Sequence, residues 1–214
     1  EEAVQKFVDM TGVKEHRESF DHQTASDFGF VAAEKLLTEK NIDRESIGVL
    51  LFGAHSTDYR RPATAGVLHK RLGLSKDCAA FDVGLGCSAF IYCTQVAASM
   101  LECSDTKRAL IIVGETMTKM IYPEDKSAAM LFGDGGAAVL LEKTEEENVL
   151  AGKVCTDGSG YRAIIAPAGG FRNLEDSHEP MVWADGSTRT LYNTNMNGTD
   201  VFSFTVTKVP KTIK

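Results

Sequence analysis

The 214-residue chain contains a single tryptophan, five prolines and five cysteines, and it has fewer basic than acidic residues. Its 23 Lys and Arg residues face 30 Asp and Glu residues, which gives a formal net charge of −7. Because an anionic chain is repelled by phosphates, we expect neither a nucleic-acid partner nor a membrane-surface partner. The longest apolar stretch, residues 79–100, is interrupted by Asp82, Gln95 and several glycines and serines, so it does not predict a membrane-spanning helix.

The cysteines favour a reducing compartment. Their number is odd, they form no CxxC pair, and they do not cluster with histidines; they are Cys78, Cys87, Cys93, Cys103 and Cys155. These features argue against a disulfide framework and against structural zinc. We therefore expect free thiols, a cytoplasmic location and no metal site.

Helical and strand-like segments alternate along most of the chain. Apolar residues at helical spacing predict three helices, over residues 25–40, 62–72 and 88–102. Continuous apolar runs predict four strands, over residues 47–53, 78–83, 109–114 and 137–141. This order predicts an α/β fold with a mixed, mostly parallel sheet covered by helices. The third helix is almost wholly apolar, so we expect it to be buried on most sides.

The pattern changes after residue 151. Residues 154–166 are strand-like, residues 169–197 predict a polar loop, and residues 200–209 form a short apolar segment. We therefore divide the chain into residues 1–150 and residues 151–214.

The strongest signal for chemistry lies in residues 81–90, FDVGLGCSAF, where a strand enters a glycine turn and Cys87 precedes the apolar helix. Free amides at the start of a helix stabilise a thiolate. Gly84 and Gly86 permit a strained turn and a close approach by a substrate. The alternative is a buried structural cysteine, which is common for free thiols. We favour this alternative for the other four cysteines, which we place in strand or helix interiors.

Several other polar residues predict structural roles. The glycine-rich segment 133–136 lacks the phosphate-loop pattern and leads into a strand, so it predicts a tight turn. Asp82 lies within an apolar strand, where we expect it to be hydrogen-bonded and to support the glycine turn rather than act as a base. The histidines are interpreted as surface or loop residues; they are His16, His22, His55, His69 and His178.

Residues 81–90 resemble the active-site segment of β-ketoacyl-acyl-carrier-protein synthase III, also called 3-oxoacyl-ACP synthase III, a condensing enzyme of the thiolase superfamily. Further matching segments follow in the same order, at residues 10–13 with Arg17, 109–116, 132–138, 156–160 and 196–202. The resemblance implies a thiolase-like fold. Residues 1–150 would form its N-terminal half without the opening strand, and residues 151–214 a connection and the start of the C-terminal half.

The same resemblance implies a mechanism for Cys87. A thioester, either acyl-CoA or acyl-ACP, would acylate the cysteine, and decarboxylated malonyl-ACP would then attack the acyl group. The backbone amide of Cys87 would form part of an oxyanion hole. The resemblance also implies a homodimer, and it implies no metal or organic cofactor.

The family uses a His and an Asn from its second half, whereas no histidine follows His178 here. We therefore expect a chain that is cut at both ends, that leaves a sheet edge unpaired, and that is inactive in condensation by itself.

Four residues of this chain differ from those that the family has at its primer-binding positions. Lys6 and Met10 stand where a Trp and an Arg are expected, Lys126 replaces an Arg, and Arg61 replaces an apolar residue before Pro62. Lysine can neutralise a phosphate but cannot stack or form a bidentate pair as arginine does. A primer other than acetyl-CoA, or an acyl chain on a carrier protein, is therefore an open alternative.

Two other functions remain open. The chain could belong to a sister synthase that makes a methylglutaryl-CoA-type thioester, a polyketide or an alkyl product. It could also be a non-catalytic partner subunit of a condensing enzyme, although such a subunit would not need Cys87.

Overall fold

The computed structural model describes residues 2–125, 128–145 and 152–213. They fall into two compact units. The first unit comprises residues 1–16, 117–133 and 155–214, and the second comprises residues 17–116 and 134–154. The division at residue 150 concerns the halves of the family's fold and stays a prediction.

The second unit contains the sheet and the helices that the sequence predicts. Its helices are α2 (Ala25–Glu39), α3 (Thr64–Leu72) and α4 (Ala89–Glu102), with a short 3-10 helix at Arg44–Ser46. Its strands are β1 (Ile47–Gly53), β2 (Ala79–Val83), β3 (Arg108–Thr116) and β4 (Asp134–Glu142). The last two strands are longer than predicted because they pair with each other from Arg108–Glu142 to Thr116–Asp134.

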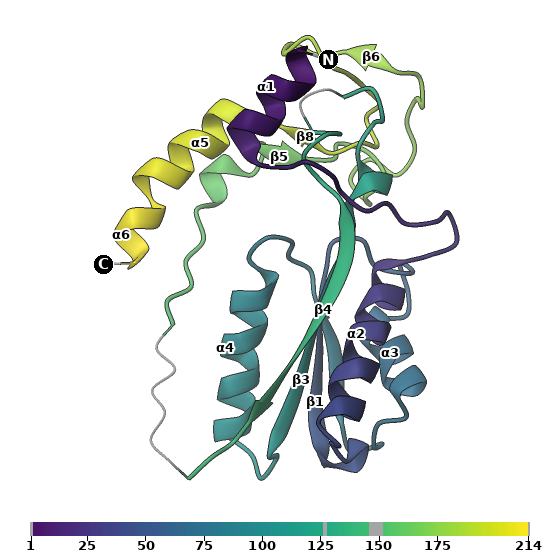
Figure 1. Ribbon diagram of the computed structural model, residues 1–214, viewed down its shortest axis with the longest axis vertical. Helices are drawn as coiled ribbons and strands as arrows, with labels where there is room; N and C mark the ends of the chain where they lie inside the picture. The colour runs from purple at the N-terminus through teal and green to yellow at the C-terminus, as the bar shows by residue number, and fades with distance from the viewer. Residues whose placement is uncertain (1, 126–127, 146–151, 214) are drawn as a thin grey trace. The chain divides into compact units, whose positions relative to one another are not determined.

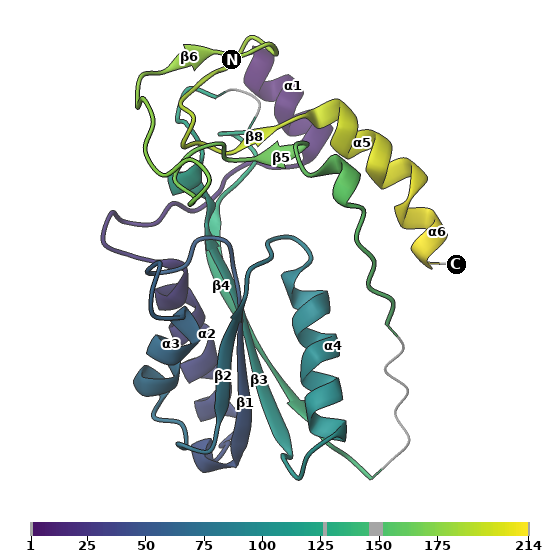
Figure 2. The same ribbon diagram turned by 180° about the vertical axis from the view of Figure 1, so that it is seen from behind.

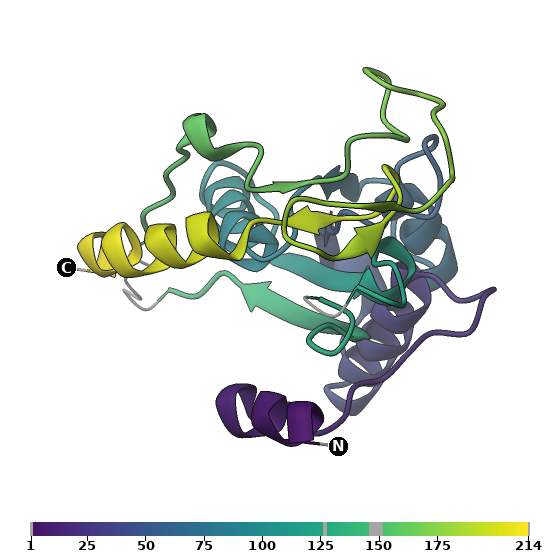
Figure 3. The ribbon, with the colours of Figure 1, turned by 90° about the horizontal axis from the view of Figure 1, so that it is seen from above.

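The strand order is β2-β1-β3-β4. Strand β1 is parallel to both β2 and β3, whereas β4 is antiparallel to β3. Helices α2 and α3 cover one side of the sheet and α4 covers the other (Figures 1 and 2), and the sheet separates α2 from α4 in Figure 3. The predicted mixed, mostly parallel α/β architecture is therefore confirmed.

The side chains of β1 point alternately to the two faces of the sheet, and the core is accordingly divided into two clusters. Leu50 and Phe52 pack with α2 and α3, whereas Val49 and Leu51 pack with α4. Successive side chains of a strand point to opposite faces, so a strand covered on both sides must be apolar throughout. This explains the continuous apolar run at residues 47–53.

The expectation that α4 is buried on most sides is wrong. The helix buries one stripe at a spacing of four residues, namely Ala89, Cys93, Ala97 and Leu101. Phe90 and Ile91 are 40% and 53% exposed. A single sheet face can cover only one stripe of a helix, which leaves the apolar residues on the other side of α4 outside the core of this unit.

The predicted turn at residues 133–136 is also wrong, because Asp134, Gly135 and Gly136 already belong to β4. A Cβ atom on Gly136 would lie 2.6 Å from the backbone nitrogen of Gly29 in α2. The glycine therefore lets the α2 backbone lie directly on the sheet rather than providing a turn.

We predict that Gly136→Ala lowers the free energy of unfolding by about 1–3 kcal/mol, because the new methyl group meets backbone atoms that cannot rotate away. Gly135→Ala is the matched control, since a Cβ there meets nothing within 4 Å. Urea denaturation of both variants measures the difference. Equal stabilities would show that the close approach of α2 places no constraint on residue 136.

The first unit has little regular structure. Its helices are α1 (Glu2–Thr11), α5 (Gly198–Thr207) and α6 (Val209–Ile213), with 3-10 helices at Met117–Met120 and Gly158–Gly160. Its strands have two residues each: β5 (Ile164–Ile165), β6 (Met181–Val182), β7 (Thr188–Arg189) and β8 (Asn195–Met196). The predicted strand over residues 154–166 is therefore wrong, since only Ile164 and Ile165 pair, and the apolar segment 200–209 is helical.

An ion pair forms the buried centre of this unit. Arg189 and Asp125 are 0% and 1% exposed, with Arg189 Nε 2.9 Å from Asp125 Oδ2. The guanidinium also donates to Asp185 Oδ2 at 2.7 Å and to Asn195 Oδ1. A buried arginine needs such partners to offset the loss of its hydration.

Candidate active site

The carboxyl ends of β1, β2 and β3 meet at one edge of the sheet, because these strands are parallel neighbours. The loop after β1 begins with Ala54 and His55, the turn after β2 contains Cys87, and β3 ends with Glu115 and Thr116. Ligands of open α/β sheets bind at this edge, where loops from adjacent strands converge. It is therefore the candidate active site.

Cys87 is exposed in a short turn between β2 and α4. Leu85 N donates to Val83 O at 2.8 Å, and Ala89 N donates to Gly86 O at 2.8 Å, so backbone hydrogen bonds hold both ends of the turn. Ser88, the N-cap residue of α4, makes no side-chain capping hydrogen bond with the described residues. The first turn of α4 also lacks an acidic side chain, so its positive end is not neutralised locally.

The predicted strain in this turn is absent, since neither Gly84 nor Gly86 has a positive φ. Gly86 has a different role. A Cβ atom there would lie 2.7 Å from Cδ2 and 3.2 Å from Nε2 of His55. Glycine at this position therefore lets the His55 ring pack against the backbone next to Cys87, and it is not required by a left-handed conformation of the turn.

Glu115 joins the end of β3 to the loop after β1. Its Oε1 accepts a hydrogen bond from His55 N at 2.7 Å, and its Oε2 accepts from Ser56 N at 3.0 Å and Ser56 Oγ at 2.5 Å. Thr116 N in turn donates to Ser56 Oγ at 2.9 Å. From the sequence, Glu115 stands out only as part of a matching segment and His55 is expected to be a surface or loop residue, because no local pattern reveals a contact over 60 residues.

Asp82 is hydrogen-bonded, as expected, but it does not support the glycine turn. Its carboxylate accepts from Thr64 N at 2.8 Å and from Ala65 N at 2.7 Å. These are the first amides of α3, so Asp82 caps that helix from the neighbouring strand. The Glu115 carboxylate, by contrast, lies beside the Cys87 turn, with Oε1 3.8 Å from where a Cβ atom on Gly86 would stand.

The other cysteines have two kinds of environment. Cys78 and Cys93 are buried, and burial raises the pKa of each thiol to about 11. Cys103 and Cys155 are exposed, which contradicts the expectation that all four lie in strand or helix interiors. Cys103 is the C-cap of α4 and Cys155 lies outside any helix or strand.

The residues expected to bind the primer fall in different units of the chain. Arg61 is exposed in the loop after β1, at the same sheet edge as Cys87. Lys6 and Met10 are exposed on α1 of the first unit. Lys126 lies outside the described residues. These residues therefore stay predictions.

Three other histidines contact residues that do not belong to the Cys87 turn. His69 Nε2 lies 2.8 Å from Ser75 O, and the rings of His22 and His178 stack on Phe20 and Tyr192. Among the described residues, no group of three His, Cys, Asp or Glu side chains is arranged to hold a metal ion. None of the described helices has the length and apolar character needed to cross a bilayer.

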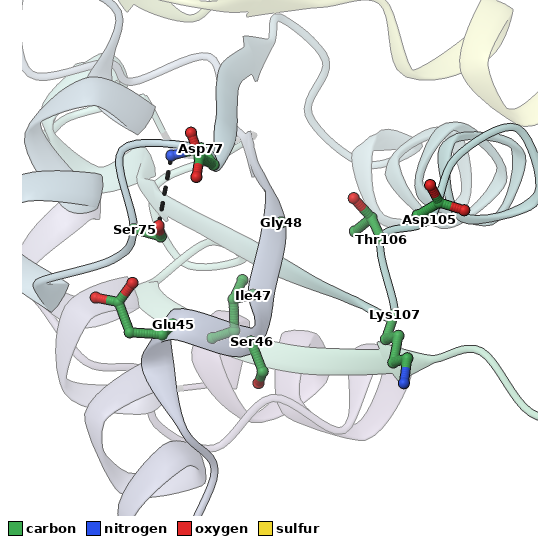
Figure 4. Close-up of a pocket in the computed structure, with 9 residues that line it drawn as sticks. All are labelled: Glu45, Ser46, Ile47, Gly48, Ser75, Asp77, Asp105, Thr106 and Lys107. Carbon is green, nitrogen blue, oxygen red and sulfur yellow. Dashed lines mark hydrogen bonds between the residues drawn. The ribbon is translucent and has the colours of Figure 1, made fainter.

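A shallow hollow of about 420 Å³ lies at the opposite, amino-terminal edge of the sheet (Figure 4). Its lining includes Ile47 and Gly48 at the start of β1 and Thr106 before β3. Its charged side chains are mostly acidic, with Lys107 the only basic residue in the lining. It is therefore separate from the edge that carries Cys87.

Known proteins resemble this chain in both sequence and architecture. Residues 81–158 match the family model of 3-oxoacyl-[acyl-carrier-protein (ACP)] synthase III. A β-ketoacyl-[acyl-carrier-protein] synthase III from Serratia proteamaculans (strain 568) is 32% identical over 203 residues, which are 95% of this chain and 59% of that protein. The chain thus spans less than two thirds of the length of this curated relative.

Solved structures of 3-oxoacyl-ACP synthase III and of OleA also resemble this chain. The crystal structure of a 3-oxoacyl-(acyl-carrier-protein) synthase III superposes with a TM-score of 0.93 at 31% identity, covering 98% of this chain and 63% of that chain. Xanthomonas campestris OleA, in crystal structures with bound lauric acid and lauroyl-CoA, superposes with a TM-score of 0.56 at 31% identity, covering 67% of this chain and 50% of that chain.

Proposed function

Because this chain is a homologue of 3-oxoacyl-[acyl-carrier-protein] synthase III with a thiolase-like α/β fold, we propose that Cys87 is the nucleophile that accepts an acyl group from a thioester. The observation that carries the proposal is the place of Cys87. It is exposed in the turn between the carboxyl end of β2 and the start of α4, where free amides stabilise a thiolate.

In the first step, the Cys87 thiolate attacks the thioester carbonyl carbon and a new carbon–sulfur bond forms. The tetrahedral intermediate collapses, its old carbon–sulfur bond breaks, and the CoA or carrier-protein thiolate leaves with the electron pair. The backbone N–H of Cys87 would donate to the carbonyl oxygen as negative charge develops on it.

In the second step, which belongs to the whole protein, malonyl-ACP loses carbon dioxide and its carbanion attacks the acyl carbonyl. A carbon–carbon bond forms and Cys87 leaves as a thiolate, which regenerates the nucleophile. The substrates are CoA and acyl-carrier-protein thioesters, the reaction needs no cofactor, and we place it in cytoplasmic fatty-acid or related biosynthesis. Arg61 and Lys126 are proposed to contact the primer.

A sister synthase is the second candidate, favoured by the similarity to OleA. Such an enzyme would share the acylation of Cys87 and differ in the nucleophile of the second step. A non-catalytic partner subunit would lack the first step as well. Acylation therefore separates both synthases from the subunit.

The test is to incubate the folded chain with short-chain, branched and long-chain acyl-CoAs and with acyl-ACP, and to measure its intact mass. We expect one acyl group per chain from at least one donor, released by neutral hydroxylamine as a thioester would be. A matched panel of thioether analogues, in which a methylene group replaces the carbonyl, should give no adduct. If no thioester acylates the chain, the proposed function is wrong.

We also propose that the chain forms a homodimer through β2. This strand pairs with β1 alone among the described strands, so its outer edge has free backbone hydrogen-bonding groups. Ala80 packs with the α2–α3 cluster and Val83 with the α4 cluster, so Phe81 faces the α4 side, where it is 37% exposed. Two copies of such an edge can pair about a two-fold axis and cover each other's apolar side chains.

We predict that Phe81→Lys converts the dimer to a monomer in sedimentation velocity at micromolar concentration. Two lysines would face each other across the two-fold axis, where like charges repel. Phe20→Lys is the control, because Phe20 is 70% exposed in a loop of the same unit. A Phe81→Lys protein that sediments like the wild type would contradict this interface.

A further inference from the structure

The loop after β1 is fixed to the end of β3 by one side chain. Glu115 accepts three hydrogen bonds from two consecutive residues of the loop, His55 and Ser56. Ser56 Oγ in turn accepts a hydrogen bond from Thr116 N at the end of β3. A carboxylate that accepts several donors forms stronger hydrogen bonds than a neutral group would. This part of the loop is therefore held in one place relative to the sheet.

The same loop supports the turn that carries Cys87. The His55 ring lies so close to Gly86 that a methyl group on that residue would overlap it, and Oε1 of Glu115 lies 3.8 Å from the same point. Contacts thus run from Glu115 through His55 to Gly86, and Cys87 is the next residue in the chain. Backbone hydrogen bonds hold the two ends of the turn, whereas His55 packs against its middle.

We propose that Glu115 and His55 are positioning residues for Cys87. Glu115 places His55, and the His55 ring sets the position of the Gly86–Cys87 peptide, and hence of both the thiol and the Cys87 N–H. The inference rests on the proposed function, in which that N–H and the thiol act on one carbonyl group. Misplacement of reacting groups by about 1 Å can cost about 100-fold in rate.

The experiment measures single-turnover acylation of Cys87 over a range of thioester concentrations. Glu115→Ala should lower the maximal rate by about 100-fold with little change in the half-saturating concentration, because the binding surface is retained. Glu115→Gln keeps one acceptor oxygen and should recover much of the rate. Glu142→Ala is the control, since it removes a carboxylate that pairs with Arg108 at the opposite edge of the sheet.

A second pair of variants tests the contact itself. Gly86→Ala should slow acylation because its methyl group overlaps His55, and His55→Ala should slow it because the turn loses its support. In the double variant the overlap is gone, so Gly86→Ala should have a much smaller effect when alanine is at position 55. A structural role unrelated to this contact would make the two effects simply additive.

The outcomes separate this inference from the proposed function. The positioning role is wrong if the wild type is acylated and the folded Glu115→Ala and His55→Ala variants are acylated at the wild-type rate. In that case the assignment of Cys87 as the nucleophile still stands. If the wild type is not acylated, the proposed function fails. Alkylation of Cys87 by iodoacetamide then tests the positioning, since unchanged alkylation rates in Glu115→Ala, His55→Ala and Gly86→Ala would overturn it. Circular dichroism establishes that each variant is folded, and Glu115→Gln replaces Glu115→Ala if the latter is not.

Discussion

Asp125→Ala is expected to lower the free energy of unfolding of the first unit by about 3–5 kcal/mol, because it leaves the Arg189 guanidinium buried without its closest buried counter-charge. The measurement is urea denaturation followed by the fluorescence of Trp183, the single tryptophan of the chain. Its indole Nε1 donates to Arg189 O at 3.2 Å, so its signal reports on the same part of the structure.

Asp185→Ala is the matched control. Asp185 also pairs with Arg189, but its side chain is 42% exposed, so we expect a loss of at most about 1 kcal/mol. Hydrogen bonds from the Ser187 backbone and from Arg189 keep the pKa of Asp185 below its ordinary value. If the two variants were equally stable, burial of the Arg189–Asp125 pair would not organise this unit.

Cys87 is expected to react with iodoacetamide about ten times faster than Cys103. Both thiols are exposed, but they flank opposite ends of α4. The amino-terminal end of a helix favours a thiolate and the carboxyl-terminal end disfavours it, by about 0.3–1 kcal/mol each and more where the site is partly buried. The nucleophile in alkylation is the thiolate, so the rate follows this difference.

The other thiols provide the remaining controls. Cys155 is exposed outside any helix and should react at an intermediate rate. Cys78 and Cys93 should stay unlabelled in the folded chain at pH 8, because burial raises the pKa of each to about 11 and shields the sulfur. Peptide mass mapping after short labelling times gives all five rates. Equal rates for Cys87 and Cys103 would contradict an activated nucleophile and favour the non-catalytic subunit.

The sequence predicted the second unit well because its signals are local. A strand buried on both faces requires the continuous apolar run of β1, and its bounds at Ile47 and Gly53 are those of the prediction. The place of Cys87 before α4 follows from a strand, two glycines and an apolar helix in sequence. Such patterns are read over about ten residues and do not depend on what lies elsewhere in the fold.

Contacts between distant residues could not be predicted in this way. Glu115 meets the loop after β1 across 60 residues, and Gly136 is glycine because α2 lies against it. The sequence likewise gives no sign that Arg189 is buried with Asp125, since both belong to polar segments. In the first unit, hydrogen bonds and the ion pairs of Arg189 replace long apolar strands, so the periodicity that identifies strands is missing.

The central claim is that Cys87 accepts the acyl group, and the intact mass of wild type and Cys87→Ala after incubation with the most reactive thioester tests it most directly. The account predicts one acyl adduct on the wild type, none on folded Cys87→Ala, and an unchanged adduct on Cys103→Ala. An adduct that persists in Cys87→Ala, or is lost only in Cys103→Ala, would contradict the assignment of the nucleophile.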